Sequence, residues 1–457
     1  MKKRIVALLM CVAMVCCMFT ACSDTEESDL KKLTDIVTRS KNAPMTLAIY
    51  GVTDSATTGE AIDAVELALN EISITKYNTT IELYLYPEEE YIPLMLSKLE
   101  TAMNSYVSTV TDPDKIKLEK TINFESDYKY ELADMTKYPE AAQSTIDIFL
   151  VFTPEEGSPL LDPNSEYYHP AATKLFDTLY AEQALVALTP YFNKNEYATL
   201  KAKSYEQFFN SVTRADWSKG PDVANPPNYV YGMPNNYVLG SYEYLILNKE
   251  AVGSVFTQDP SVLVENTELY NQLKKDLTSL YNKGKLNVQK VEAVYNSYEE
   301  YAASDDTFAI AKIKGDSAFP QVIANPNFEV IKYTKTAFEL SECRESMFCI
   351  SRATPKGVNE EDRVRRCLDI LLLMDNDETF RNTFQYGVKG EHYQLGRDGT
   401  VYPSSPDYSM NPKYTGNMFL LYPSDNMTVT MQLLAENHWE LAKKQNTEII
   451  ENKSLKK

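Results

Sequence analysis

The feature that most constrains the fold is an alternation of strand-like and helix-like segments in the first third of the chain. The strand-like segments are 45–50, 80–86 and 146–152, and the helix-like segments are 61–72 and 88–107. Apolar residues recur at helical spacing in the latter. The third strand is almost continuously apolar, as in a buried parallel sheet. The sequence therefore predicts an α/β fold with mainly parallel sheets flanked by helices.

Length and charge limit the possible architecture and partners. A chain of 457 residues is too long for one small core and suits two lobes. The net charge of −20 argues against nucleic acid as a partner and against electrostatic adhesion to anionic lipid. We expect a monomer.

The N-terminus predicts export and lipid anchoring. A basic start is followed by an apolar run and then by Thr20, Ala21 and Cys22, as in a bacterial lipoprotein signal. Residues 1–21 would be the signal peptide, and the thiol of Cys22 would carry lipid such as palmitate. Residues 22–43 would be a tether on the extracytoplasmic face of the cell membrane. The alternative is a plain secretory signal that is cut elsewhere.

Cysteine use beyond the signal region does not indicate a disulfide scaffold. Only Cys343, Cys349 and Cys367 remain for the fold. The first two could pair across adjacent strands or stay free. Cys367 lies at helical spacing with Val364 and Leu371, and we expect it to be buried.

Further segments continue the alternation towards the C-terminus. The predicted strands are 229–233, 239–247, 308–313, 328–333 and 346–351, and the predicted helices are 265–282, 360–374, 377–384 and 426–444. Pro234, Asn235 and Asn236 mark a break between two of the strands.

Several motifs occur in the order found in a known family. They are Ala48-Ile49-Tyr50-Gly51-Val52-Thr53-Asp54, Ile146-Asp147-Ile148-Phe149-Leu150, Val230-Tyr231-Gly232-Met233-Pro234, Gly315-Asp316, Ser351-Arg352-Ala353 and Tyr386-Gly387-Val388-Lys389-Gly390-Glu391-His392-Tyr393. Together with the lipoprotein signal, this order resembles the extracellular solute-binding proteins of ABC importers. The cluster is the one that includes maltose-binding protein, and the resemblance is strongest to its Gram-positive lipoprotein branch.

The resemblance implies a type II clamp of two lobes, like the periplasmic binding proteins. Lobe one would comprise 44–235 plus 343–385, and lobe two 236–342 plus 386–457. Such a clamp captures a carbohydrate, here an oligosaccharide, and delivers it to the membrane permease subunits of an importer. The resemblance implies no enzymatic activity and no cofactor.

Candidate ligand-binding residues follow from the rule that open α/β sheets bind ligands beyond the carboxyl ends of their strands. They are Tyr50, Thr53 and Asp54 after the first strand, Phe152 after the third, Asn235, Asn236 and Tyr237 at a strand break, and Asp316 in a Gly-Asp turn. Each has an alternative reading. Tyr50 could cap a sheet edge, Asp54 could cap a helix, and Asn235 and Asn236 could form a plain turn.

Two aromatic residues complete the predicted site. Trp217 lies in a polar stretch, where its indole could stack on a sugar face or pack under a loop. Tyr386 flanks a hinge-like turn and could reach the ligand. Sugar recognition needs this mixture, because polar groups pair with the rim hydroxyls and aromatic rings cover the C–H faces.

Other classes of function lack a specific signal. The three histidines, His169, His392 and His438, are widely spaced, which disfavours a zinc site. The sequence has no Gly-x-Ser-x-Gly motif, Walker loop or dinucleotide fingerprint. A secreted glycoside hydrolase with a carboxylate pair remains the alternative from another class. A receptor for a peptide or another polar solute remains the alternative within the binding class.

Overall fold

The structure is a computed structural model, and only part of the chain is described. The described residues are 42–53, 56–109, 145–154, 157–194, 196–202, 206–216, 224–235, 240–296, 298–335, 346–355, 357–396, 400–403, 414, 416–417, 430–431 and 438–451. The predicted signal peptide, the predicted lipidation site Cys22 and most of the predicted tether lie outside them. Every helix among the described residues is too short or too polar to cross a bilayer.

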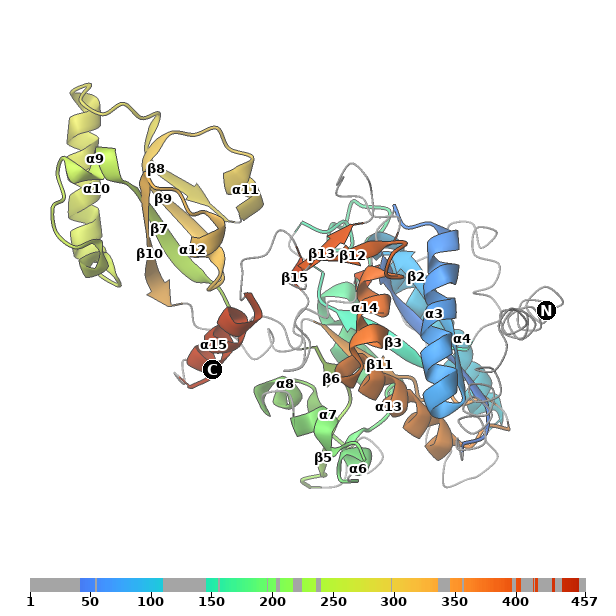
Figure 1. Ribbon diagram of the computed structural model, residues 1–457. Coiled ribbons are helices and arrows are strands. Elements are labelled where there is room, and N and C mark those ends of the chain that lie inside the picture. Colours follow the sequence, from blue (N-terminus) through green and yellow to red (C-terminus); the bar gives the residue numbers. More distant parts are fainter. Residues whose placement is uncertain are drawn as a thin grey trace, which may run out of the picture.

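The first lobe is built on a six-stranded mixed sheet (Figure 1). Its strands are β1 (Met45–Thr53), β2 (Thr79–Pro87), β3 (Ile148–Phe152), β6 (Met233–Pro234), β11 (Ser346–Ile350) and β14 (Gly416–Asn417). β1 pairs in parallel with β2 on one side and β3 on the other. β11 then pairs antiparallel to β3, β6 antiparallel to β11, and β14 antiparallel to the end of β1.

Helices cover this sheet with their apolar sides. They are α3 (Gly59–Tyr77), α4 (Glu88–Thr109), α13 (Glu360–Asn376) and α14 (Glu378–Tyr386). In α3 the Thr58 hydroxyl accepts from the backbone N–H of Ala61, which caps the helix start. Ala61, Val65 and Leu69 recur at helical spacing and are buried in the core of the lobe. The apolar period seen in the sequence therefore sets which face of α3 packs on the sheet.

A peripheral group of short elements belongs to the same core. It comprises η1 (Ala172–Lys174), α5 (Leu175–Ala181), α6 (Thr189–Phe192), α7 (Ala198–Ala202), α8 (Glu206–Ser211), β4 (Thr213–Ala215) and β5 (Asn228–Val230). β4 and β5 pair antiparallel, so Ala215 lies opposite Asn228. β5 leads directly into β6 of the main sheet.

The second lobe has a four-stranded sheet of order β10-β7-β9-β8. Its elements are β7 (Tyr242–Asn248), α9 (Lys249–Gly253), η3 (Pro260–Leu263), α10 (Thr267–Asn282), β8 (Lys290–Tyr295), α11 (Tyr298–Ala302), β9 (Phe308–Gly315), α12 (Phe319–Val322), β10 (Phe328–Lys335) and α15 (His438–Glu451). Two apolar clusters form its core. Figure 1 shows this sheet in a separate body from the first sheet.

Most elements agree with the sequence predictions, and the α/β fold class is confirmed. The strand directions differ in part. The parallel core of the first sheet is β2-β1-β3, whereas in the second sheet only β8 and β9 are parallel. A fully buried strand is apolar on both faces in either direction, so the apolar runs could not distinguish them.

The C-terminal segment is divided between the lobes, which differs from the predicted assignment of 386–457 to lobe two. β14 joins the first sheet, and Tyr414 is buried in the core of the first lobe. A small sheet of β12 (Tyr393–Leu395), β13 (Thr400–Pro403) and β15 (Thr430–Met431) follows α14. Among the described residues after 386, those that form hydrogen bonds with the second lobe belong to α15. The predicted helix at 426–444 is also wrong in its start, because β15 occupies part of it.

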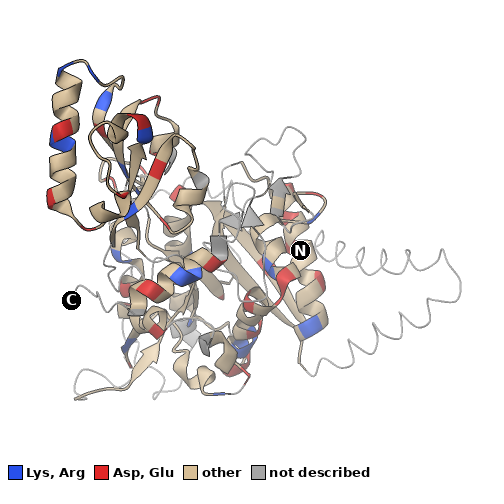
Figure 2. Ribbon diagram, turned by 60° about the vertical axis from the view of Figure 1, so that its left-hand side comes forward, with Lys and Arg blue, Asp and Glu red and all other residues tan. Residues whose placement is uncertain are grey.

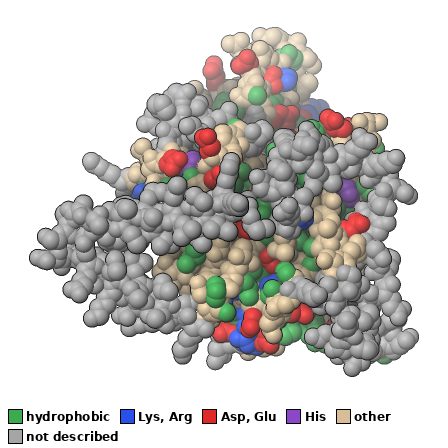
Figure 3. Space-filling model, turned by 90° about the vertical axis from the view of Figure 1, so that its right-hand side faces the viewer, with side chains coloured by type: hydrophobic (Ala, Val, Ile, Leu, Met, Phe, Trp, Pro, Cys, Tyr) green, Lys and Arg blue, Asp and Glu red, His purple; other side chains and the backbone are tan. Residues whose placement is uncertain are grey.

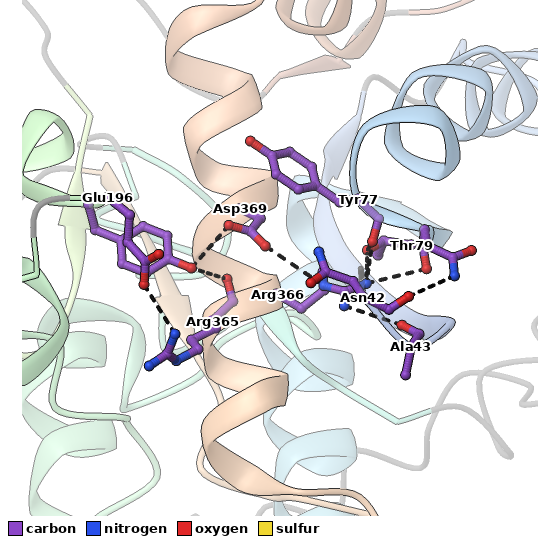
Figure 4. A network of polar contacts seen from close by, with 10 residues as sticks. Asn42, Ala43, Tyr77, Thr79, Glu196, Arg365, Arg366 and Asp369 are labelled. Atoms are coloured by element: carbon purple, nitrogen blue, oxygen red, sulfur yellow. Dashed lines mark hydrogen bonds and ion pairs between the residues drawn. The ribbon is translucent and has the colours of Figure 1, made fainter. Parts of the chain in front are cut away.

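The buried Arg366 of α13 is hydrogen-bonded to the amino end of the first sheet. The Arg366 guanidinium donates to the carbonyls of Tyr77 and Ala43 and to the Thr79 hydroxyl (Figure 4). Asp369, one turn along, lies 3.7 Å from Arg366 and accepts the Tyr197 hydroxyl at 3.0 Å. This network ties α13 to the start of β2 and to the chain just before β1.

Candidate functional site

The carboxyl end of the first sheet brings together residues from four separate parts of the chain. β1 ends at Thr53 and β3 ends at Phe152, and both strands run in the same direction. β11 returns antiparallel, so its first residue, Ser346, lies opposite Phe152. The Asn235 side chain donates to the Ser346 hydroxyl at 3.0 Å, and its backbone N–H donates to the Ser346 carbonyl. We call Thr53, Phe152, Asn235 and Ser346 the first edge.

The side chains of the first edge differ in what they offer. The Thr53 hydroxyl donates to the Thr57 hydroxyl at 2.7 Å, and the Thr53 backbone lies opposite Gly416 of β14. Phe152 is buried and its ring packs against Tyr91. Among the described residues of the first edge, the polar groups are therefore hydroxyls, an amide and backbone groups, which can donate and accept hydrogen bonds without a charge.

The second lobe presents a polar turn at the end of β9. The Asp316 carboxylate accepts from the backbone N–H groups of Ala318 and Phe319, at 2.8 and 3.1 Å. The Tyr244 hydroxyl donates to the Asp316 carbonyl at 2.8 Å. Asp316 thus fixes the turn that leads into α12. We call Gly315, Asp316 and Ser317 the second edge.

The chain itself limits the distance between the two edges. Asn235 belongs to the first edge, and Gly240 is hydrogen-bonded to the helix α15 that also holds Ser317. Five peptide units join Asn235 to Gly240, and an extended chain of that length spans at most about 18 Å. The two edges therefore flank the same crossover between the lobes.

Tyr50 does not lie where the sequence placed it. The sequence ended the first strand at residue 50, but β1 continues to Thr53 because β2 pairs with it along its whole length. Tyr50 is only 1% exposed and stacks on Tyr84 with 4.8 Å between ring centroids. The predicted position at a strand end is wrong, and the ring is part of the core.

Tyr386 is half-buried at the end of α14. Its ring lies 5.8 Å from that of Tyr393 in β12. Burial raises the pKa of Tyr386 to about 12, so its hydroxyl stays protonated at neutral pH. Gly387 follows with φ of +89°, a conformation that favours glycine, and turns the chain sharply away. Its contact with a ligand stays a prediction.

The remaining predicted site residues, Asp54, Trp217, Asn236 and Tyr237, lie outside the described residues. The neighbour of Trp217 is described: the backbone N–H of Asp216 donates to the Pro227 carbonyl, beside the β4–β5 pair. Contact between Trp217 and a ligand stays a prediction.

Sequence reasoning missed Ser346 and Gln445. Ser346 was expected only as the first residue of a strand, and nothing local shows that this strand returns beside β3. Gln445 is fully buried in α15, where a polar residue interrupts the apolar side of the helix. A glutamine at a core position of a helix was the available signal.

Two described cysteines and one described histidine lie buried in the core or hydrogen-bonded to the backbone. Cys349 and Cys367 are free and buried, and burial raises the pKa of both thiols. The prediction for Cys367 is confirmed, while Cys343 lies outside the described residues. His169 accepts the Ala171 backbone N–H through Nδ1. Within the described ranges, no three His, Cys, Asp or Glu side chains gather as metal ligands would.

Figure 2 shows positions of Lys or Arg and positions of Asp or Glu along the described helices. Figure 3 shows one face of the first lobe, where hydrophobic and charged side chains are intermixed. Exposed large apolar residues include Leu67 and Ile74 on α3 and Val294 on β8. Scattered apolar residues of this kind are ordinary on a protein surface.

Comparison with known proteins gives similarity to solved structures only. No protein-family model matches the chain, and no curated protein matches it. The chain is similar to the N-glycan transport solute binding protein from Streptococcus pneumoniae, at 13% identity and a TM-score of 0.45, over 89% of this chain and 83% of that one. It is also similar to an extracellular solute-binding protein from Bifidobacterium longum subsp. infantis, at 9% identity and a TM-score of 0.40, over 90% and 82%. A third is a probable secreted solute-binding lipoprotein from Streptomyces coelicolor, at 8% identity and a TM-score of 0.35, over 89% and 94%.

Proposed function

We propose that this protein is an extracytoplasmic solute-binding lipoprotein that captures a carbohydrate between two lobes and delivers it to an ABC importer. The observation that carries the proposal is the pair of polar edges that flank one short crossover. Asn235 ends the first edge, and Gly240 begins the chain segment that is tied to the second edge. A ligand held at the crossover would meet hydrogen-bonding groups of both lobes.

Capture by two lobes has a simple thermodynamic basis. A ligand shifts an equilibrium only by its difference in affinity for the two states. A solute that bonds both edges favours the closed arrangement, whereas a solute that bonds one edge does not. The permease subunits would recognise the closed arrangement, and release there would return the protein to the open one.

The chemistry of the edges supports a neutral, hydroxyl-rich solute. The contacts of Asn235 and Ser346 join neutral groups, and the Asp316 carboxylate already accepts two backbone N–H groups. Hydroxyl groups of a sugar can donate to and accept from such partners. Trp217, if it stacks on the sugar, would add on the order of 1 kcal/mol beyond area burial.

Anchoring is the second part of the proposal. The thiol of Cys22 would carry the lipid, and residues 22–43 would let the folded part stand clear of the membrane. Mass spectrometry of the membrane fraction would detect a diacylated N-terminal peptide that begins at Cys22. A Cys22→Ser variant should instead appear in the culture medium.

Native mass spectrometry of the purified protein tests the function first, by detection of a bound solute. A thermal-shift panel of di- to pentasaccharides follows, since a ligand at 100 times its Kd stabilises the folded state by about 2.7 kcal/mol. The same mixtures should be analysed for products after incubation. Binding without turnover supports the receptor, whereas hydrolysis would establish the glycosidase alternative. Stabilisation by peptides alone would overturn the carbohydrate proposal.

A matched pair of variants tests the site. Asn235→Ala removes one neutral hydrogen-bonding group from the first edge, and a lost bond of about 1 kcal/mol weakens binding roughly five-fold. Asn282→Ala is the control, because Asn282 is exposed at the end of α10 in the second lobe. Equal affinity in the two variants would place the ligand elsewhere.

A further inference from the structure

The C-terminal helix α15 connects the crossover to the second edge through one buried side chain. The Gln445 side-chain oxygen accepts from both the backbone N–H and the hydroxyl of Ser317, at 2.7 and 2.8 Å. Its amide nitrogen donates to the Gly240 carbonyl at 3.0 Å. The Gln445 amide therefore joins the turn at the end of β9 to the chain just before β7, in addition to the direct antiparallel pairing of Tyr242 with Gly315.

The geometry around Gly240 makes this link specific. Gly240 has φ of +61°, so its carbonyl is presented from a left-handed conformation that favours glycine. Gln445 is fully buried, and its amide accepts through the oxygen and donates through the nitrogen without a charge. Removal of either arm would leave a buried polar group without its bond, which is unfavourable.

The next turn of α15 strengthens the attachment. Glu448 accepts the Tyr242 hydroxyl at 3.2 Å and pairs with Lys332 at 3.3 Å. The Lys332 ammonium also lies over the Tyr242 ring, 3.3 Å from its centroid. Gly240 and Tyr242, at the start of β7, are thus both held by α15.

We propose that Gln445 is a positioning residue that couples the second edge to the crossover between the lobes. A displacement of Ser317 is passed through the Gln445 side chain to Gly240, and α15 acts as the rigid part of the connection. That this coupling serves ligand capture rests on the proposed function. The coupling itself is a property of the protein without ligand.

Three variants separate the two arms. Gln445→Glu keeps an acceptor for Ser317 and loses the donor to Gly240. Gln445→Met removes both arms at similar volume, and Ser317→Ala removes only the hydroxyl bond. Glu440→Gln is the control, because Glu440 is an exposed residue in the first turn of the same helix.

Hydrogen–deuterium exchange tests the local bond. The Ser317 amide should exchange roughly five-fold faster in Gln445→Met, the equivalent of about 1 kcal/mol for one lost hydrogen bond. In Gln445→Glu its rate should stay near that of the control. An unchanged rate in Gln445→Met would overturn the structural assignment.

Double electron–electron resonance spectroscopy, which measures the distance between two nitroxide labels, tests the coupling. The labels are placed on Leu67→Cys in α3 and Val294→Cys in β8, which are 51% and 60% exposed in the two lobes. A labelled sample without the two new cysteines corrects for native thiols. Without ligand, Gln445→Glu and Gln445→Met should give a broader inter-lobe distance distribution than Glu440→Gln, with Ser317→Ala between them.

The outcomes distinguish coupling from mere stability. Variants that melt earlier but keep the distribution of the control would show that Gln445 only stabilises the second lobe, which overturns the proposal. Should Gln445→Met not fold, Gln445→Glu and Ser317→Ala carry the same test. A broadened distribution in a protein that binds no saccharide would support the coupling and refute the proposed function alone.

Discussion

Replacement of Arg363 by methionine should destabilise the first lobe strongly. Arg363 is 1% exposed and pairs with Asp147, which precedes β3. Its guanidinium also donates to the Ser351 carbonyl and to the Thr354 hydroxyl. Asp147 in turn accepts the Ala48 backbone N–H of β1 at 2.8 Å. One ion pair therefore connects β1, β3, the end of β11 and α13.

The magnitude follows from what the substitution leaves behind. Burial alone would lower the pKa of Arg363, but the Asp147 carboxylate together with Cys367 and Glu360 outweighs burial and the pKa is raised, so the guanidinium is charged at any relevant pH. Loss of one partner of a buried ion pair costs about 3–5 kcal/mol, because the other charge stays buried without it. The methionine side chain keeps most of the apolar stem in place.

Arg365→Met is the matched control. Arg365 lies on the same helix and is 38% exposed, where it pairs with Glu196 and Glu361. Surface pairs of this kind contribute about 0–1 kcal/mol. Urea denaturation followed by circular dichroism at pH 7 measures both variants. The double variant Asp147→Asn/Arg363→Met should recover part of the loss, since it removes the uncompensated charge.

The reasoning fails if the free energies of unfolding of Arg363→Met and Arg365→Met differ by less than about 1 kcal/mol, since exposed ion pairs alone span that range. It also fails if the double variant is as unstable as the sum of the single ones. Additivity would mean that Asp147 and Arg363 do not depend on each other.

Three further predictions concern single residues of the first lobe and of the turn after α14. Tyr50→Ala should cost about 3–5 kcal/mol, as truncation of a buried aromatic ring does, measured by denaturation, and a small loss would mean that the ring is not in the core. Burial raises the pKa of Asp369 to about 6, so its protonated form adds stability that is fully present below the ordinary pKa and is lost as pH rises through 6. The melting temperature should therefore fall less between pH 4.5 and pH 7.5 for Asp369→Asn than for the wild type. Equal falls in the two proteins would contradict this. Gly387→Ala should cost about 1–3 kcal/mol more stability than Gly390→Ala, as overpacking does. Both residues have φ of +89°, so the backbone strain is equal, but only an alanine at 387 would place its Cβ 2.7 Å from His392. Equal losses would argue against that contact.

The parts of the fold that the sequence predicted share a local signal. β1, α3, β2, α4 and β3 each show their own period or apolar run, and the structure places them as expected. β14 has only two residues and therefore no period, so its pairing with β1 could not be foreseen. The antiparallel return of β11 is a non-local feature for the same reason.

The candidate site was predictable to the level of strand ends and not to that of side chains. Asn235 and Asp316 were placed correctly at chain breaks beside strands, but their partners Ser346 and Tyr244 come from distant segments. Tyr50 was misplaced because Gly51 and the small residues after it resemble a loop. β1 continues through them because nine residues of β2 supply a partner for every position.

The two ends of β3 are held by bonds of different strength, and this bears on where a ligand can act. At the amino end, a buried ion pair joins Asp147 to Arg363, and breaking it is costly. At the carboxyl end, the bond between Asn235 and Ser346 joins two neutral groups and is worth about 1 kcal/mol. A solute can replace a neutral bond of that size with one of its own at little loss. If the protein captures a solute as we propose, the ion pair at the amino end would keep the sheet in register while Asn235 and Ser346 at the carboxyl end bond to the solute and release it.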